Sequence, residues 1–223
     1  MTPDVLMPTT PPVLLPKPRL RGWIHAGMVP LVIASGVVLI VLAKGPGAKA
    51  SCAVFIASAI LLFANSAVYH LGAWSQVVTS VLRRLDHSNI ALIIAGTYTP
   101  LAVLLLSGGL RLLLLWLVWG GALAAIAVRL VWLNAPRWSY VPIYVVLGWT
   151  ALWFMPNFWR AGGPAVVWLI LAGGLAYTAG AVVYGLKRPN PWPQVFGFHE
   201  LFHVGTVAGY TCHFISVMTV ALR

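Results

Sequence analysis

The stretch that decides the fold is residues 22–43, GWIHAGMVPLVIASGVVLIVLA, which contains no Lys, Arg, Asp or Glu. As a helix it would be about 33 Å long, and the hydrocarbon core of a bilayer is about 30 Å thick. A secretory signal has a shorter apolar core and ends in a small-residue cleavage site, which is not evident here. We therefore predict a retained first transmembrane helix.

Apolar stretches of similar length recur along the 223-residue chain. Hydrophobic residues make up 61% of the sequence and charged residues 8%, which excludes a soluble domain, where about 25% charged residues is usual. Two cysteines, Cys52 and Cys212, are too few for a disulfide scaffold. We predict an all-α polytopic membrane protein, with one domain over residues 22–223. Its seven transmembrane helices are expected at 22–43, 50–70, 88–106, 111–133, 140–158, 164–186 and 195–222.

Two segments outside these helices have distinct sequence patterns. Residues 1–21 hold six prolines and end in Lys17, Arg19 and Arg21, which predicts a disordered cytoplasmic tail with a basic anchor at the membrane edge. In residues 74–85, apolar side chains recur at helical spacing on one face and polar side chains fill the other. This pattern predicts a short helix lying in the membrane interface.

The formal net charge is +11, which in a soluble protein would suggest a nucleic-acid partner. In a membrane protein, basic residues indicate orientation, because cytoplasmic loops are enriched in Lys and Arg. Seven helices place nine basic residues on the N-terminal face and five on the other. We predict a cytoplasmic N-terminus, a C-terminus outside and no nucleic-acid partner.

Ionisable side chains are costly in hydrocarbon, so the few inside the predicted helices are candidates for function. Four of them fall at one depth, near the N-terminal face. They are His70 at the end of the second helix, Asp86 at the start of the third, and His199 and His203 in the first turns of the seventh. Ser66 precedes His70 by four residues, as His199 precedes His203, so each pair lies on one helix face.

Three imidazoles from two helices suit zinc, which in catalytic sites takes three protein ligands and keeps one position open for water. We predict that His70, His199 and His203 are the ligands. Asp86 would hold or deprotonate the bound water, directly or through Ser66. Ser66 could also donate to a developing oxyanion.

Two alternative interpretations of this cluster stay open. The histidines can form an interhelical hydrogen-bond network without a metal. Asp86 can pair with Arg83 or Arg84 at the start of a helix, where a carboxylate also suits the helix dipole.

The string HELFH at residues 199–203 also matches the H-E-x-x-H motif of metalloproteases, in which the glutamate is the general base. A pattern with only three fixed positions often occurs by chance. The sequence after it contains no signature of a third zinc ligand. Glu200 points about 100° away from His199 around the helix. This favours a role beside the metal or at the level of the headgroups.

The remaining histidines favour simpler interpretations. His213 lies about 21 Å along the helix from His199, too far to share its metal, and is predicted to be a hydrogen-bonded core residue. His25 is predicted to pack or to contact headgroups. His87 is predicted to be an interfacial residue.

Several sequence blocks carry a resemblance to a known family. They are SAVYH at 66–70, RLDHSNI at 84–90, IAGTYTP at 94–100, GAVVY at 180–184 and HELFH at 199–203, followed by His213 and Phe214. In the order and spacing of these blocks the chain resembles the haemolysin III proteins. These are bacterial members of the progestin and adipoQ receptor family of seven-helix membrane proteins, which are distantly related to alkaline ceramidases.

The resemblance implies a zinc ion near the cytoplasmic ends of the helices, bound by His70, His199 and His203. Ser66 and Asp86 match the family's serine and aspartate. The resemblance also implies slow lipid-amidase activity or a part in membrane-lipid homeostasis, and residence in a bacterial inner membrane.

The leading hypothesis is a slow zinc-dependent hydrolase of a lipid amide or ester, with membrane lipids as substrate or ligand. The second is a sensor of membrane-lipid state in which zinc is structural. A pore-forming cytolysin, which the family's name suggests, lacks the polar residues needed to line a channel. Facing histidines can also be axial haem ligands, although three at one depth suit zinc better.

Overall fold

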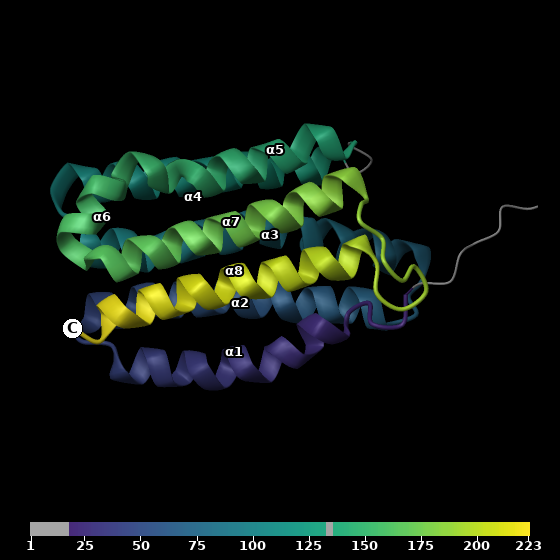
Figure 1. Ribbon diagram of the computed structural model, residues 1–223, viewed down its shortest axis with the longest axis horizontal. Coiled ribbons are helices and arrows are strands. Elements are labelled where there is room, and N and C mark those ends of the chain that lie inside the picture. The colour runs from purple at the N-terminus through teal and green to yellow at the C-terminus, as the bar shows by residue number, and fades with distance from the viewer. Residues whose placement is uncertain (1–17, 133–135) are drawn as a thin grey trace, which may run out of the picture.

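The computed structural model describes residues 18–132 and 136–223, and this part of the chain is all-helical (Figure 1). Seven stretches of it are long and apolar enough to cross a membrane, with Trp138–Gly162 counted as one. The predicted fold class is therefore confirmed. The elements are α1 (Trp23–Leu42), α2 (Pro46–Leu71), α3 (Gln76–Leu105), α4 (Gly108–Val131), α5 (Arg137–Gly148), η1 (Trp149–Phe154), α6 (Met155–Gly162), α7 (Pro164–Leu186) and α8 (Phe198–Ala221).

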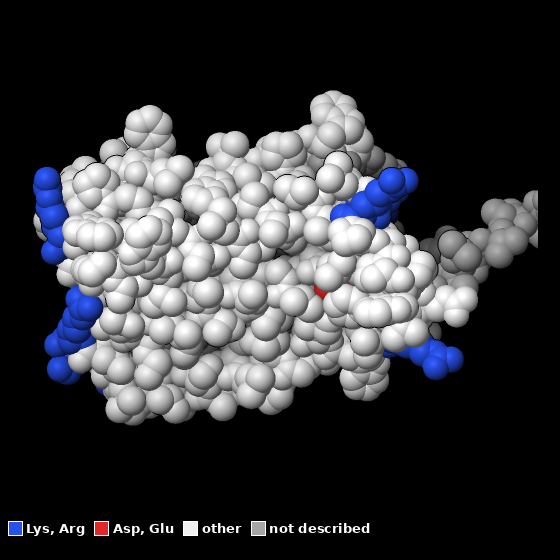
Figure 2. Space-filling model, in the orientation of Figure 1, with Lys and Arg blue, Asp and Glu red and all other residues white. Residues whose placement is uncertain are grey.

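The helices run side by side along the long axis of the molecule, with α8 between α7 and α1 in the front layer (Figure 1). On the face drawn in Figure 2, Lys and Arg gather at the two ends, and a wide band without Lys or Arg separates them. This distribution is that of an integral membrane protein, because charged side chains are kept out of the hydrocarbon region.

The prediction of a separate interfacial helix over residues 74–85 is wrong. From Gln76 onward these residues are the first turns of α3, whose backbone continues without a break to Leu105. Ser75 caps the helix by accepting a hydrogen bond from the backbone N–H of Val78, at 3.4 Å. No Gly or Pro occurs between Ser75 and Gly96, so nothing in the sequence ends the helix before the transmembrane part.

The predicted fifth span, 140–158, is interrupted. The α-helical turns of α5 give way to the 3-10 helix η1 before α6 begins. Tyr98 of α3 reaches this change of helix type: its hydroxyl donates to the carbonyl of Gly148 and accepts from the backbone N–H of Ala151. A side chain from a neighbouring helix thus forms hydrogen bonds with backbone groups at the interruption. The hydrocarbon chains of lipids could not form these bonds.

The segment before α8 is hydrogen bonded to the segment before α1. The backbone N–H groups of Arg19 and Leu20 donate to the carbonyls of Gln194 and Val195, at 3.0 and 3.2 Å. Residues 1–17 of the predicted disordered tail lie outside the described residues. Residues 19–21 form turns, and the hydrogen bonds of Arg19 and Leu20 hold this segment against the one before α8.

Helices α7 and α8 pack through glycine. A Cβ atom on Gly205 would lie 3.0 Å from the carbonyl oxygen of Ala176 and 3.0 Å from the Cα of Gly180. A Cβ atom on Gly180 would in turn lie 3.2 Å from the carbonyl oxygen of Phe202. The small residues of segment 172–181 thus permit a close approach of α7, which fixes it against α8 about half a turn beyond His203.

We expect Tyr98→Phe to lower the free energy of unfolding by about 1–3 kcal/mol, because it leaves buried backbone groups of η1 unpaired. Thermal unfolding in detergent measures this change. Tyr177→Phe is the matched control, since the buried hydroxyl of Tyr177 has no hydrogen-bond partner in the described part of the chain. Equal losses in the two variants would contradict the assigned role of Tyr98.

We expect Gly205→Ala to destabilise the protein by about 1–3 kcal/mol. The added methyl group would collide with backbone atoms of α7, which cannot adopt another rotamer to avoid it. Gly120→Ala in α4 is the control: its added methyl group meets nothing within 4 Å. Its better helix propensity should leave stability unchanged or raise it by up to about 1 kcal/mol. A Gly205→Ala variant as stable as Gly120→Ala would show that the two helices do not depend on this close contact.

Candidate metal centre

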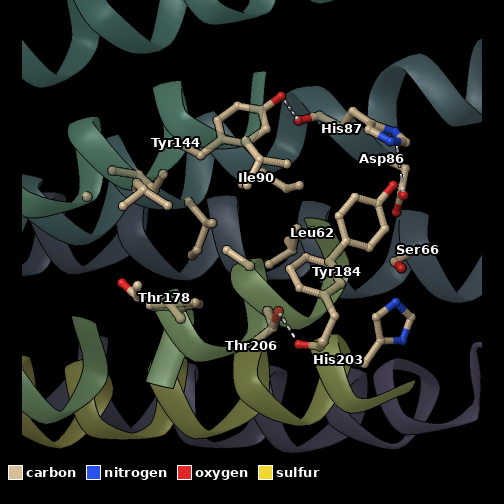
Figure 3. Close-up of a pocket in the computed structure, with 18 of the residues that line it drawn as sticks. Leu62, Ser66, Asp86, His87, Ile90, Tyr144, Thr178, Tyr184, His203 and Thr206 are labelled. Carbon is tan, nitrogen blue, oxygen red and sulfur yellow. Dashed lines mark hydrogen bonds and ion pairs between the residues drawn. The ribbon is translucent and has the colours of Figure 1, made fainter. Parts of the chain in front are cut away.

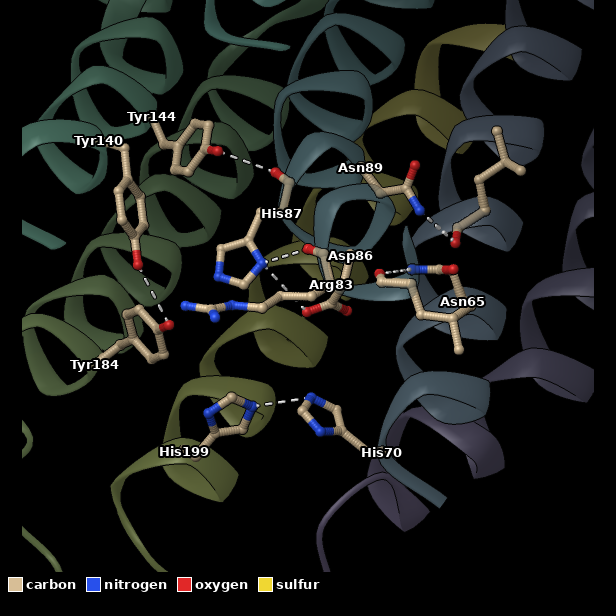
Figure 4. A network of polar contacts seen from close by, with 12 residues as sticks. Asn65, His70, Arg83, Asp86, His87, Asn89, Tyr140, Tyr144, Tyr184 and His199 are labelled. Carbon is tan, nitrogen blue, oxygen red and sulfur yellow. Dashed lines mark hydrogen bonds and ion pairs between the residues drawn. The ribbon is translucent and has the colours of Figure 1, made fainter. Parts of the chain in front are cut away.

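Three histidine side chains converge at one end of the bundle. His70 comes from the last turn of α2, and His199 and His203 come from the first turns of α8. One ring nitrogen from each lies within 4.8 Å of the others. The Nε2 atoms of His70 and His199 are 3.1 Å apart, and a dashed line marks this contact in Figure 4. The structure thus brings together all three residues predicted as ligands.

The geometry of these nitrogens fits zinc. With Zn–N bonds of about 2.0–2.1 Å, tetrahedral coordination separates two ligand nitrogens by about 3.3–3.4 Å. The pair from His70 and His199 is already close to this value. The widest separation, 4.8 Å, would close by small rotations of the side chains. The 3.1 Å contact equally suits a hydrogen bond between two neutral imidazoles, so the metal-free network remains an alternative.

Asp86 and Ser66 lie at the same end of the bundle, on neighbouring helices. Ser66 is 2% exposed, and its side chain lies beside that of Asp86. Figure 3 shows both side chains facing the space beside His203. Within the described residues Asp86 forms no ion pair with Arg83 or Arg84, and Nδ1 of His87 lies 3.9 Å from its Oδ2. The alternative role as a partner of these arginines is therefore wrong for the described structure.

Glu200 has a structural role that the sequence motif did not indicate. Its side chain is fully buried, and Oε1 accepts a hydrogen bond from Nε of Arg21 at 2.8 Å. Its Oε2 accepts from the backbone N–H of Gly197 at 2.8 Å, which completes a cap at the start of α8. Both carboxylate oxygens are engaged, so Glu200 does not stand as the base of an H-E-x-x-H protease.

The other histidines divide into three cases. His213 is a buried core residue, and its Nδ1 donates to the carbonyl of Gly209 at 2.8 Å, which confirms its prediction. The sequence predicts that His25 either packs or contacts headgroups. In the structure it packs in the core against His203. The prediction for His87 is wrong, because only 8% of the residue is exposed and its Nδ1 donates to the carbonyl of Arg83.

A cavity of about 470 Å³ extends from this cluster into the bundle. Figure 3 shows Ser66, Asp86 and His203 at one end of it and Thr178 at the other, with Leu62 and Ile90 between. His213 also lines the cavity, so it follows α8 for about 21 Å, which is most of the thickness of a hydrocarbon core. A volume of this size suits a small molecule or a single lipid chain.

Tyrosine residues from α5 and α7 also border the site. The ring of Tyr184 lies 5.6 Å from that of His199, and its hydroxyl is 3.5 Å from the hydroxyl of Tyr140. Tyr144 donates a hydrogen bond to the backbone carbonyl of His87 at 3.0 Å. The GAVVY block contains Tyr184 but does not indicate that it lies beside His199. No sequence pattern indicates that Tyr140 and Tyr144 of α5 border the site.

Comparison with known proteins identifies the family of the chain. Residues 14–214 match the family model described as Haemolysin-III related. The chain is 28% identical over 197 residues to the Hemolysin-3 homolog of Bacillus subtilis (strain 168), covering 87% of this chain and 89% of that protein. It is 27% identical over 191 residues to Hemolysin-3 of Bacillus cereus, covering 84% of each.

A plant protein is similar as well. The chain is 29% identical over 182 residues to the Heptahelical transmembrane protein ADIPOR2 of Oryza sativa subsp. japonica, covering 74% of this chain and 79% of that protein. The matches include the helices that carry the three histidines and extend over nearly the whole transmembrane bundle. The chain therefore belongs to the haemolysin III family of integral membrane proteins, which is related to the adiponectin receptors.

Proposed function

We propose that this protein is a slow zinc-dependent hydrolase of amide or ester bonds in membrane lipids, linked to membrane-lipid homeostasis. The observation that carries the proposal is the meeting of three histidines, a carboxylate and a hydroxyl at one end of a deep cavity with apolar walls. Such a combination of convergent polar groups and an enclosed apolar space is typical of a site that binds and transforms a lipid.

In this proposal His70, His199 and His203 hold the zinc. Bound zinc would supply a Lewis acid that makes water nucleophilic at neutral pH and polarises a substrate carbonyl. Glu200 has no part in the chemistry, since its carboxylate is engaged by Arg21 and Gly197.

Asp86 and Ser66 would complete the reaction. The Asp86 carboxylate would accept a proton from the attacking water and return it to the leaving group. Ser66, which interacts with Asp86, would orient this carboxylate or donate a hydrogen bond to the oxyanion that develops on the carbonyl. The two side chains come from different helices, so their mutual geometry depends on the packing of α2 against α3.

The shape of the cavity supports a substrate with a long apolar chain. Its walls between the two polar ends include Leu62, Ile90, Ile94 and Ile170. An acyl chain would lie along α8 with its amide or ester group beside the histidines. Following the bias of basic residues, we place the histidine end and the N-terminus on the cytoplasmic side of a bacterial inner membrane, and the C-terminus outside.

The first test of this proposal is metal content. Purified wild-type protein should contain about one zinc per chain, as measured by elemental mass spectrometry, because three imidazoles complete a catalytic zinc site with water as the fourth ligand. His70→Ala and His203→Ala should lose it, since two imidazoles bind zinc far more weakly. Asp86→Asn should retain most of it.

His213→Asn is the matched control, because His213 is a buried histidine of the same helix about 21 Å from His199. Its zinc content should equal that of the wild type. A well-folded wild type without metal, or a loss in His213→Asn equal to that in His203→Ala, would overturn the assignment of the ligands.

The second test is turnover of lipid amides and esters with acyl chains of different length. Asp86→Asn should lower kcat by about 10²–10⁴ while zinc is retained, as expected for loss of a general base. Ser66→Ala should lower kcat by about 10²–10³ if its hydroxyl stabilises the oxyanion. Ser88→Ala should leave kcat unchanged, because this buried hydroxyl has no hydrogen-bond partner in the described part of α3.

Two outcomes would favour other functions. Zinc-replete protein that turns over no lipid in the panel would favour a lipid sensor with structural zinc. Leakage from liposomes that persists when His70, His199 and His203 are all replaced would favour a cytolysin.

A further inference from the structure

The most unusual buried group outside the proposed ligand set is His25 of α1. It is 2% exposed, and neither of its ring nitrogens has a hydrogen-bond partner among the described residues. A buried polar atom without a partner costs about 1–3 kcal/mol, so an apolar residue of similar shape would serve the core better. Hydrogen bonding therefore does not explain why a histidine occupies this buried position.

The contacts of His25 point to His203. The two rings lie face to face, with centroids 3.7 Å apart and an angle of 12° between their planes. Phe63 also packs against His25, with the two rings perpendicular and their centroids 5.0 Å apart, at an angle of 84°. His25 is thus held in place by packing and presents one flat face to His203.

His203 needs such support more than an ordinary metal ligand does. A histidine that binds a metal usually donates its second ring N–H to a carboxylate, a carbonyl or water, which fixes the plane of the ring. In the described structure Nδ1 of His203 is buried and has no such partner. Among its ring contacts with His25, His70, His199 and Phe202, the stack with His25 is the closest and the only parallel one in the described structure.

The same geometry excludes His25 as a fourth ligand to the same ion. A metal bound by His203 lies in the plane of that ring, about 2.0–2.1 Å from the nitrogen. Because the two rings are nearly parallel, that ion would lie well above the plane of His25, where the ring nitrogens have no lone pair directed at it. Coordination by His25 would require the stack to break.

We propose that His25 is a positioning residue that acts through its ring face: it fixes the plane of His203 and stabilises the positive charge that a bound metal would place on that ring. Aromatic faces attract cationic groups, and the attraction grows when water is excluded. This inference rests on the proposed metal centre, but the contact between the rings does not depend on a bound metal.

The decisive comparison is His25→Phe against His25→Leu. Phe keeps an aromatic face and lacks the nitrogens, whereas Leu is of similar size and lacks the face. In zinc competition titrations His25→Leu should bind about 10–100-fold more weakly than wild type, as is usual when the support of a ligand is lost, and His25→Phe should stay close to wild type. The visible spectrum of bound Co²⁺ should change in His25→Leu and be kept in His25→Phe.

Two results would overturn the proposal. If His25→Phe binds zinc as weakly as His25→Leu, a ring nitrogen is what matters. If both variants bind like wild type, His25 does not position His203. Melting temperatures of both variants in detergent show whether a loss of affinity is merely a loss of fold.

A second measurement works on chelator-treated protein. The drop in melting temperature for His25→Leu combined with His203→Leu should be smaller than the sum of the two single drops, because both remove one shared contact. His213→Leu combined with His203→Leu should be additive. Additive behaviour in the His25 pair would overturn the stacking role, whereas absence of zinc from wild type would overturn only the metal centre.

Discussion

In hydrocarbon a polar group must find its partner inside the protein, and this constraint governs the whole bundle. It explains why Tyr98 reaches across to the interruption at η1, where its hydroxyl pairs backbone groups on both sides of the change in helix type. It also explains the buried carboxylate of Glu200, which is covered by one guanidinium and one backbone N–H. An ionisable group that does not serve such pairing then becomes informative about function.

The exceptions to this rule include the histidine end of the bundle. His25 and His203 bury three ring nitrogens without partners among the described residues, while His213, in the same helix as His203, is hydrogen bonded. A core selected for stability alone would hold few such atoms, because each lowers stability. Their concentration beside His70 and His199 is the physical reason to regard this end of the bundle as a binding site for an ion.

The helix number and the three ligand candidates could be predicted because they depend on local properties, namely the length of apolar runs and the spacing of four residues between paired side chains. The interfacial helix at 74–85 was wrong because amphipathic spacing identifies a helix but not its end, and no residue there stops α3. The stacking of His25 on His203 and the hydrogen bonds of Tyr98 join segments far apart in the sequence. No spacing rule indicates them, since they arise only when the helices pack.

Glu200 shows how a local motif can be satisfied for a different reason. In H-E-x-x-H the glutamate must face the metal with a free oxygen, but here it follows the glycine that begins α8 and lies three residues beyond Gly197, which is the position of a capping carboxylate. The same carboxylate neutralises Arg21, just before α1, so it ties the two helices that carry His25 and His203. Its contribution to the site is therefore indirect: by holding the start of α8 against the start of α1, it keeps the two stacked rings in register.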